Sequence, residues 1–500
     1  MIAFSTVDDL LACGPANEAA LISPERGIEK AREELVEEVD KLAKAFFAVG
    51  IERGSIVVCV LPNGIDYVKT MLAIGSLGAA FAPLNPAYKV EEFLFYFKDI
   101  KPDLIVIPPD SGKDLRVAIP KDVLVAELLN DLNGNHELRV KEKLIHSATS
   151  RSFAEPDDIA LILHTSGSTG RPKQVPLLHR NLIASATSIA TFYELSREDI
   201  SLCVMPLFHI HGLVASTLGA LAGGGSVVIP EKVAPRRVWK HLVDYGVTWF
   251  SAGPTVHHML LNRVEESESF PSLKFTRSCS SALSSKLFQK AEEIYGVPML
   301  EAYGMTEASH QVASNPLPPR ERIIGSVGVA SGTEIMVADS SGKSLGVGEV
   351  GEVCVRGPGV MPGYLNDSTM GDSLFLGGWF RTGDQGVIGP EGYLRLTGRI
   401  KELILRGGEN ISPIEIEEVL LAHPAVEEAV AFGIANEKYG ENVEAAVLLS
   451  GDVTKKELIA HSRERLAAFK VPVEIHVLNS IPRTATGKVQ RRHVAETIYP

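Results

Sequence analysis

The chain carries the stretch Ile159-Ala-Leu-Ile-Leu-His-Thr-Ser-Gly-Ser-Thr-Gly-Arg-Pro-Lys173, in which an apolar run leads directly into a loop of small and hydroxyl-bearing residues. Small residues allow backbone N–H groups to crowd around phosphate oxygens, hydroxyls can donate hydrogen bonds to them, and lysine adds positive charge. The expected phosphate-binding residues are Thr165, Ser166, Gly167, Ser168, Thr169, Gly170 and Lys173. A solvated Ser/Gly loop is the alternative interpretation of this stretch on its own.

The loop differs from the P-loop of many nucleotide hydrolases. The pattern GxxxxGK[ST] is not met, because Pro172 precedes the lysine and Gln174 stands where a magnesium-binding hydroxyl is required. Proline also disfavours helical geometry at Arg171. The sequence therefore predicts a flexible lid over phosphates rather than a cradle at the start of a helix.

Apolar strands and amphipathic helices alternate on both sides of this loop. The expected strands cover residues 56–61, 104–107, 159–164, 226–229 and 248–252, and the expected helices cover 33–49 and 67–77. Such alternation is typical of α/β layers with largely parallel sheets. Residues 109–152 are polar and irregular, and we expect them to form an excursion on the surface.

The chain is too long for one core and changes its pattern twice. At 500 residues, two or more domains are expected. Short strands and glycine-rich turns over residues 325–398 predict a small, mostly antiparallel barrel. Later, Ser412-Pro-Ile-Glu415 has the residues of a helix start. The expected class is α/β, with a large N-terminal domain (1–398) of two α/β layers plus the barrel, and a small mobile α+β C-terminal domain (402–500).

The composition excludes several classes of protein. Lys and Arg total 49 against 62 Asp and Glu, a net charge of −13, which disfavours nucleic-acid binding. The five cysteines show no CxxC spacing, so no zinc or redox motif is visible, and scattered thiols indicate a reducing compartment. No apolar run is long enough for a membrane span, and the N-terminus does not look like a secretory signal. We therefore expect a cytoplasmic protein.

Five further motifs follow the loop in order. They are Pro206-Leu-Phe-His-Ile-His-Gly212, Tyr303-Gly-Met-Thr-Glu307, Gly378-Trp-Phe-Arg-Thr-Gly-Asp384, Gly398-Arg-Ile-Lys-Glu-Leu-Ile-Leu-Arg-Gly-Gly-Glu-Asn410 and Pro482-Arg-Thr-Ala-Thr-Gly-Lys488. Together with the loop they resemble the adenylate-forming superfamily, which contains acyl-CoA synthetases, luciferases and the adenylation domains of peptide synthetases. The resemblance covers nearly the whole chain. It implies an AMP-forming acid–thiol ligase that uses ATP, Mg²⁺ and coenzyme A.

The resemblance also implies residue roles. Residues 165–173 would hold the β- and γ-phosphates of ATP, and Tyr303 would lie beside the adenine. Glu307 would ligate Mg²⁺, a cation that seeks carboxylate and phosphate oxygens. The other implied positions are Thr306 near the α-phosphate, Asp384 and Arg399 at the ribose, Ser281 and Ala302 elsewhere at the nucleotide, Lys488 between the acid and the α-phosphate, and Lys401 as the hinge. The implied catalytic residues are Lys488, His209, Thr306 and Glu307.

This set of residues fits a two-step reaction. A carboxylate is a poor electrophile, and attack on the α-phosphorus provides it with a leaving group while negative charge builds up on oxygen. Mg²⁺ on Glu307 and the Lys488 ammonium would stabilise that charge. A hinge at Lys401 would then withdraw Lys488 and bring in Arg406-Gly-Gly-Glu409 for the thiol step.

The expected acid pocket is polar. A fatty or aromatic acid requires a mostly apolar pocket, whereas the implied substrate residues here are His209, His211, Ser280, Ser309 and His310. A histidine such as His310 can pair with a second carboxylate. The strings Thr306-Glu-Ala-Ser-His-Gln311 and Arg277-Ser-Cys-Ser-Ser281 look like the oxalyl-CoA synthetases of plants and fungi. Oxalate, or another short polar or dicarboxylic acid, is therefore the expected substrate.

Coenzyme A recognition is assigned to Arg406, Gly407, Gly408, Tyr439 and Phe469, with Tyr439 stacking on the CoA adenine. A surface tyrosine packed on its own domain is the alternative. Three other functions also stay open: a medium-chain or aromatic acyl-CoA ligase, a stand-alone adenylation enzyme that loads a separate carrier protein, and a non-catalytic nucleotide-binding protein. The oligomeric state is left open.

Overall fold

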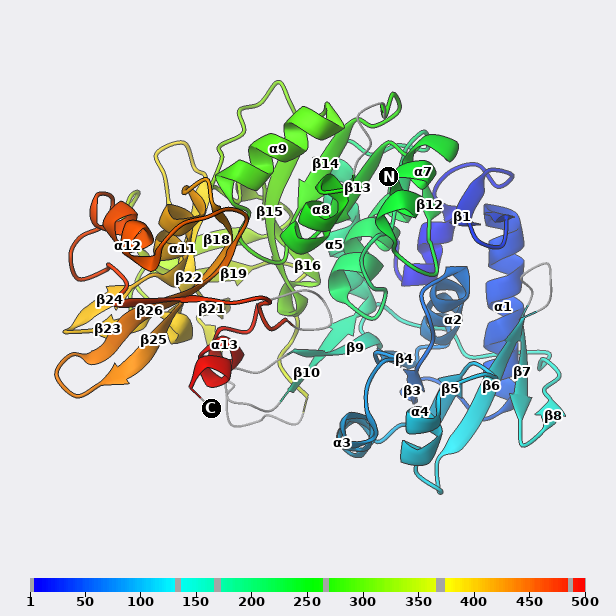
Figure 1. The fold of residues 1–500 in the computed structure, drawn as a ribbon. Helices are drawn as coiled ribbons and strands as arrows, with labels where there is room; N and C mark the ends of the chain where they lie inside the picture. The colour runs from blue at the N-terminus through cyan, green and yellow to red at the C-terminus, as the bar shows by residue number, and fades with distance from the viewer. Residues whose placement is uncertain are drawn as a thin grey trace.

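The computed structural model of this protein describes residues 4–130, 136–165, 172–263, 269–365, 374–483 and 489–499. Three sheets lie in the larger N-terminal part of the chain and one sheet lies in the smaller C-terminal part, which is coloured orange to red in Figure 1. This confirms the expected α/β class with a large N-terminal domain and a small C-terminal one. Within the described ranges, every helix is too short or too polar to cross a membrane.

An eight-stranded sheet brackets the phosphate loop. Its strands are β3 (Ile56–Cys59), β4 (Ala80–Pro83), β5 (Leu104–Ile107), β6 (Leu124–Asn130), β7 (His136–Val140), β8 (Lys143–Leu144), β9 (Ile159–Thr165) and β10 (Lys173–Leu178). They run in the order β10-β9-β4-β3-β5-β6-β7-β8. The central strands are parallel and buried, as their β-branched runs predict. Thr165 ends β9 and faces Lys173 at the start of β10, so the two strands hold both ends of the loop.

The expectation for residues 109–152 is wrong. They contain α4 (Lys113–Ala118) and the strands β6, β7 and β8, which extend the sheet beyond β5. One face of β6 and β7 packs into the core through Ala126, Leu128, Leu138 and Val140. The residues between them face outward. Their polar composition therefore reflects an edge of the sheet that is covered on one face only.

A nine-stranded sheet carries the remaining parallel strands. Its members are β1 (Ala19–Ser23), β2 (Ile28–Ala31), β11 (Ile200–Leu202), β12 (Ser226–Val228), β13 (Trp249–Ala252), β14 (Phe275–Ser278), β15 (Met299–Met305), β16 (His310–Ser314) and β17 (Val329–Ala330). Their order is β17-β16-β15-β14-β13-β11-β12-β1-β2. Since β13, β14 and β15 are parallel, the residues that follow them meet at one edge of the sheet, where α/β folds bind ligands.

Helices fill the space around these sheets. They are η1 (Val7–Ala12), α1 (Arg32–Ala48), α2 (Ile65–Ser76), α3 (Val90–Ile100), α5 (His179–Phe192), the π-helix η2 (His211–Leu218), α6 (Gly219–Ala222), α7 (Pro235–Asp244), α8 (Pro254–Leu261), α9 (Ser285–Tyr295) and η3 (Thr306–Ala308). One core joins Met71 of α2, Leu182 of α5 and Leu213 of η2 to Val57 and Trp249 of the two sheets. The helix α2 is buried at every position except Asp66, and its one buried lysine, Lys69, is paired with Glu38 at 2.8 Å.

The expected barrel region forms an antiparallel sheet. Its strands are β18 (Glu334–Ala338), β19 (Gly351–Arg356), β20 (Phe375–Leu376), β21 (Trp379–Ile388) and β22 (Leu394–Arg399). The pairing of β21 with β22 places Asp384 opposite Arg399. Two residues that the sequence assigns to the ribose therefore lie side by side.

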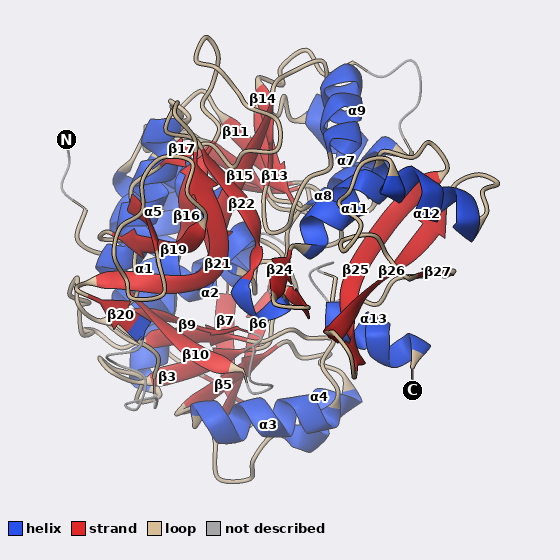
Figure 2. Cartoon of the chain, turned by 90° about the vertical axis from the view of Figure 1, so that its left-hand side faces the viewer, coloured by secondary structure: helices blue, strands red, loops and turns tan. Residues whose placement is uncertain are grey.

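The C-terminal part has its own sheet and core. Its elements are η4 (Ile400–Glu402), β23 (Ile404–Arg406), β24 (Glu409–Ile411), α11 (Pro413–Leu421), β25 (Val426–Asn436), β26 (Gly440–Leu449), α12 (Lys455–Arg463), β27 (Glu474–Val477) and α13 (Arg491–Ile498). As predicted, Ser412 caps α11, its hydroxyl oxygen accepting from the Glu415 N–H at 3.4 Å. Figure 2 shows β25, β26 and β27 to one side of the N-terminal sheets. Lys401 is exposed in η4, between the two parts; its hinge role and the domain limits stay predictions.

Candidate active site

A lysine, a tyrosine and a glutamate converge at the start of β10. Lys173 Nζ lies 4.4 Å from the centre of the Tyr364 ring, and the Tyr364 hydroxyl donates to Glu307 Oε1 at 2.9 Å. Glu307 and Thr306 belong to η3, directly after β15, and Glu307 is buried. Lys173 and Glu307 thus both contact the side chain of Tyr364 at the end of the sheet.

Six predicted site residues lie outside the described part of the chain. They are Ser166, Gly167, Ser168, Thr169, Gly170 and Lys488. Thr165 and Lys173, on either side of the first segment, are described. Arg483, directly before the second segment, is also described.

The predicted ribose site is a triad in which Tyr303 and Asp384 are buried and Arg399 is half-buried. The Tyr303 hydroxyl donates to Asp384 Oδ2 at 2.5 Å, and Arg399 Nε lies 2.9 Å from Asp384 Oδ1. The Asp384 charge raises the pKa of Arg399, and burial followed by the same charge raises the pKa of Tyr303 well above its ordinary value. Ala302 is buried next to Tyr303 in β15, whereas Ser281 is exposed after β14.

Two histidines and a serine form the core of the predicted acid pocket. His211 Nδ1 lies 2.9 Å from Ser280 Oγ, and the rings of His211 and His310 have their centres 5.0 Å apart. Burial first, and then the positive charge of Arg277, lower the pKa of both histidines well below the ordinary value, so both are neutral. His209 is half-buried close to this pair and contributes to the same lowering.

Ser309 differs from its neighbours in this pocket. It is fully buried, and its hydroxyl donates to the Gly359 carbonyl oxygen at 2.8 Å. Backbone φ angles of 53° at Ser309 and 99° at His310 turn the chain between η3 and β16. The structure therefore gives the Ser309 hydroxyl a backbone partner, while the His310 ring lies against His211.

Sequence reasoning assigned no role to three residues of this region: Tyr364, Ser251 and Arg277. Arg277 is fully buried in β14 and bonds Ser251 of β13, with which it is in register. The available signal for Arg277 was the string Arg277-Ser-Cys-Ser-Ser281, which the resemblance singled out without a role for the arginine. Tyr364 and Ser251 carry no such signal, because only the fold brings them to Glu307 and to His211.

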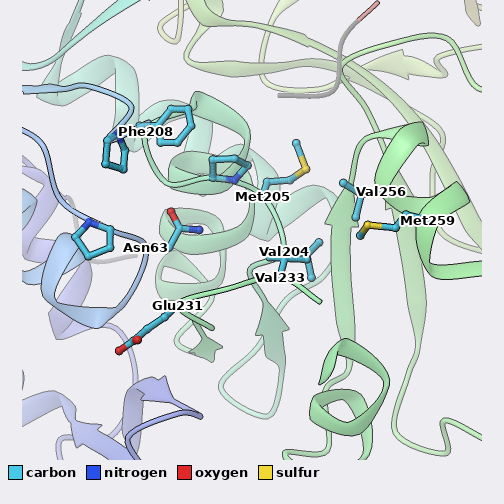
Figure 3. Close-up of a pocket in the computed structure, with 11 residues that line it drawn as sticks. Asn63, Val204, Met205, Phe208, Glu231, Val233, Val256 and Met259 are labelled. Atoms are coloured by element: carbon cyan, nitrogen blue, oxygen red, sulfur yellow. The ribbon is translucent and has the colours of Figure 1, made fainter. Parts of the chain in front are cut away.

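An apolar cleft opens beside His209. Figure 3 shows its lining, which includes Met205, Phe208, Val256 and Met259. Its volume is about 450 Å³, and Glu231 contributes a carboxylate to its wall.

The residues assigned to CoA come together at one place on the C-terminal domain. The Arg406 guanidinium carbon lies 5.0 Å from the centre of the Tyr439 ring, Arg406 Nη1 donates to the Phe469 carbonyl oxygen at 2.6 Å, and Gly407 N donates to the Tyr439 carbonyl oxygen at 2.7 Å. Gly408 is exposed beside them, with a φ of 90°. Tyr439 and Phe469 remain 40% and 37% exposed, so both rings can meet a ligand.

The donor set for a cation is small. In the ranges that the structure describes, no three His, Cys, Asp or Glu side chains gather into a metal cluster. Glu307 alone offers a carboxylate beside Lys173. This fits Mg²⁺ held between one carboxylate and nucleotide phosphates, which is its usual mode of binding.

Relatives and solved structures agree with this geometry. Residues 12–365 match the AMP-binding enzyme family, and residues 415–488 match the AMP-binding enzyme C-terminal domain. An oxalate–CoA ligase of Saccharomyces cerevisiae is 42% identical over 463 residues, covering 87% of this chain and 85% of that protein. An oxalate–CoA ligase of Arabidopsis thaliana is 42% identical over 458 residues, covering 89% of each chain.

The fold also matches the crystal structures of MatB from Rhodopseudomonas palustris. The ATP-bound form has a TM-score of 0.90 at 27% identity over 99% of each chain, and the apo form has a TM-score of 0.80 over the same share. The overall similarity is thus higher to the ATP-bound form than to the apo form. The family match over most of the chain and the CoA ligases among its relatives lead to one conclusion: the chain belongs to the AMP-binding enzyme family, as an AMP-forming acid–CoA ligase.

Proposed function

We propose that this ligase activates oxalate or another short dicarboxylic acid. An AMP-forming acid–CoA ligase uses ATP with Mg²⁺ to make an acyl-adenylate, and then transfers the acyl group to CoA. The observation that carries the choice of acid is the contact of His211 with Ser280, with the buried His310 ring beside it. The neutral His310 imidazole, whose buried Nε2 has no partner among the described residues, and the Ser280 hydroxyl can form hydrogen bonds with a second carboxylate, which a purely apolar acid lacks. The two oxalate–CoA ligases among the relatives support the same choice.

We assign the nucleotide to the edge where β15, β21 and β22 meet. Asp384, held by Tyr303 and Arg399, offers carboxylate oxygens to the ribose hydroxyls. The adenine would lie beside Tyr303, near Ala302 and Ser281. Residues 165–173 would hold the β- and γ-phosphates, with Lys173 as their positive charge. Thr306, one residue before Glu307, would reach the α-phosphate.

The chemistry requires charge stabilisation rather than a strong base, because the attacking carboxylate is already ionised. Its oxygen attacks the α-phosphorus, the bond to the pyrophosphate oxygen breaks, and pyrophosphate leaves with that electron pair. Lys488 would neutralise the charge that develops on the α-phosphate oxygens. Bound to Glu307 and the phosphates, Mg²⁺ would add Lewis-acid stabilisation of the same charge. His209 would stand at the mouth of the acid pocket.

The second half-reaction needs a different arrangement of the same domains. The thiol of CoA attacks the acyl carbon, and AMP leaves. Arg406, Gly407, Gly408, Tyr439 and Phe469 lie together and would bind CoA on the C-terminal domain. Exchanging Lys488 for this surface requires rotation about a hinge, for which we propose Lys401 in η4.

The apolar cleft favours a second candidate acid. Its 450 Å³ are lined by Met205, Phe208, Val256 and Met259, close to His209. Such a lining suits a medium-chain or aromatic acid better than oxalate. Transfer to a separate carrier protein instead of CoA is the other alternative to test.

The deciding measurement is the rate of AMP release with ATP, Mg²⁺ and CoA, with one acid tested at a time. The acids are oxalate, malonate, succinate, acetate, octanoate and coumarate. CoA-dependent turnover highest for oxalate supports the proposal. Turnover restricted to octanoate or coumarate would keep the enzyme class and refute the dicarboxylic acid, with the cleft as the acyl site. Adenylation of an acid without transfer to CoA would point to a carrier thiol.

A further inference from the structure

Arg277 is a buried charge that has neutral partners. Its guanidinium donates to the Tyr193 hydroxyl at 2.8 Å, to Ser251 Oγ at 2.8 Å and to Gln311 Oε1 at 3.0 Å. Among the residues that the structure describes, Arg277, which is 0% exposed, forms no ion pair with a carboxylate, and the groups that act on its charge are Tyr193 and Cys279. A buried charge without a counter-ion is costly. An anion bound nearby would recover part of that cost.

Ser251 extends this contact to His211 and from there to the acid pocket. Ser251 Oγ lies 2.6 Å from His211 Nε2, and His211 Nδ1 lies 2.9 Å from Ser280 Oγ. Ser251 and His211 are 0% exposed, whereas Ser280 is exposed. Arg277, Ser251, His211 and Ser280 therefore form one chain of hydrogen bonds, called the relay below, from the core to the pocket surface.

The chemistry of the side chains determines which atom donates in each hydrogen bond of the relay. Arginine only donates, so Ser251 Oγ accepts from Arg277. The Ser251 hydroxyl hydrogen then has one described acceptor, His211 Nε2, and leaving that buried hydrogen unpaired would be unfavourable. A neutral imidazole that accepts at Nε2 carries its proton at Nδ1. His211 Nδ1–H therefore donates to Ser280 Oγ.

We propose that Arg277 and Ser251 are positioning residues that hold His211 in the Nδ1–H tautomer, so that Ser280 keeps its own hydroxyl hydrogen for the second carboxylate of the substrate. This rests on the proposed function, because only a dicarboxylic acid places an oxygen there. The fixed charge of Arg277 adds long-range attraction for a dianion over a monoanion. The left-handed backbone at Ser280, with a φ of 79°, is uncommon for a residue with a side chain and is typical of functional sites.

The relay predicts a coupling between Ser251 and Ser280 that a purely structural network lacks. We would measure kcat/KM for oxalate and for acetate, with the KM for ATP as a control of the fold, in Ser251→Ala, Ser280→Ala and the double variant. Each single change should lower the ratio of oxalate to acetate activity by about tenfold. The double variant should lose no more than Ser280→Ala alone. A further tenfold loss in the double variant, or equal losses for both acids, would overturn the relay.

Variants of Arg277 test the charge. Arg277→Gln keeps a donor for Ser251 but removes the positive charge, and should reduce the preference for oxalate by about tenfold. Arg277→Lys should keep most of that preference. Equal behaviour of the two variants on both acids would overturn the electrostatic part of the proposal.

The tautomer of His211 can be determined in the absence of an acid substrate. In ¹⁵N-histidine-labelled protein, with His211→Asn to identify the resonance, His211 should be protonated at Nδ1 and should lose this fixed tautomer in Ser251→Ala. Protonation at Nε2 in the unmodified protein would refute the relay. If the unmodified enzyme activates no dicarboxylic acid while the Nδ1–H tautomer is present, the substrate assignment is overturned and the hydrogen-bond chain is upheld.

Discussion

Asp384 shows at the scale of one residue how a carboxylate is prepared for a ligand. Its two oxygens are held by the Tyr303 hydroxyl and by Arg399 Nε, and it is only 5% exposed. Arg399 comes from the paired strand β22 and Tyr303 from β15 of a second sheet, so the fold itself holds the carboxylate and would orient it before a nucleotide binds there as proposed. Such preorganisation lowers the entropy lost on binding.

We expect Asp384→Ala to raise the KM for ATP by about ten- to a hundredfold, since hydrogen bonds to charged groups contribute about 1.5–3 kcal/mol. The matched comparison is Tyr303→Phe, which removes one of the two groups that hold Asp384 but keeps the carboxylate, and should raise the KM for ATP by less than Asp384→Ala does. Initial rates of pyrophosphate release against ATP concentration provide the measurement. An unchanged KM in Asp384→Ala would refute the ribose assignment.

Glu301 makes stability depend on pH. Burial in β15 raises the pKa of its carboxyl to about 8. An unfolded glutamate titrates near ~4.3, so between these values the folded state keeps a proton that the unfolded state releases. The unfolded state then binds fewer protons, and the free energy of unfolding falls as the pH rises from about 5 to about 8.

Glu301→Gln should flatten this dependence, because an amide does not titrate. Thermal unfolding between pH 5 and 8 should therefore show a smaller decrease in Tm for Glu301→Gln than for the unmodified protein. Glu33→Gln, at an exposed position of α1, is the control and should leave the slope unchanged. Identical slopes for all three proteins would mean that Glu301 is ionised in the folded state.

At the scale of elements, periodicity predicted α1, α2 and five strands, β3, β5, β9, β12 and β13, to within a few residues. It failed at β6, β7 and β8, where an edge covered on one face has a polar composition that resembles a loop. Prediction of the candidate site residues had the same limit. Motifs read along the chain identified Glu307, Asp384 and Arg399, but local sequence carries no information about the pairing of β13 with β14, which joins Ser251 to Arg277.

Gly328 lies where two sheets meet, and we expect a side chain at this position to destabilise the fold strongly. Its N-terminal neighbour Val327 donates to the Leu394 carbonyl, and Leu394 N donates to the Gly328 carbonyl at 2.7 Å. A Cβ at Gly328 would lie 1.9 Å from the backbone of Ser314, with a φ of +84°. We expect Gly328→Ala to destabilise the protein by about 3 kcal/mol or more, from overpacking and backbone strain together.

Gly325 provides the matched control for this position. Its φ is +74°, but a Cβ there would meet no atom within 4 Å. Gly325→Ala should therefore cost only the backbone strain, about 1–2 kcal/mol. Urea unfolding followed by fluorescence compares the two variants. Equal losses would show that the close approach to Ser314 relaxes without cost.

At the scale of the whole molecule, the C-terminal domain contacts the N-terminal one through single polar pairs in the part of the chain that the structure describes, among them His258 Nε2 with Glu427 Oε1 at 3.5 Å. Arg483 Nη1 donates to Thr255 Oγ1 of α8 at 2.9 Å, while Arg483 is also paired with Glu428 of β25. Another contact, from Lys286 Nζ to the Pro424 carbonyl oxygen at 3.5 Å, is exposed. Small interfaces of this kind permit domain motion. The proposed exchange of Lys488 for Arg406 between the two steps would require such an interface.

Arg483 directly precedes residues 484–488, so its contact with α8 bears on where Lys488 is held. Arg483→Ala should slow formation of the acyl-adenylate by about three- to tenfold, the effect of one or two lost hydrogen bonds, and should leave thioester formation from supplied acyl-adenylate unchanged. Lys488→Ala should show the same asymmetry with a larger loss, and Lys286→Ala should show no loss because its contact is exposed. Single-turnover measurements of each half-reaction separate these cases. Equal losses in both half-reactions for Lys488→Ala would mean that one fixed arrangement serves both steps, and the hinge at Lys401 would then have no role.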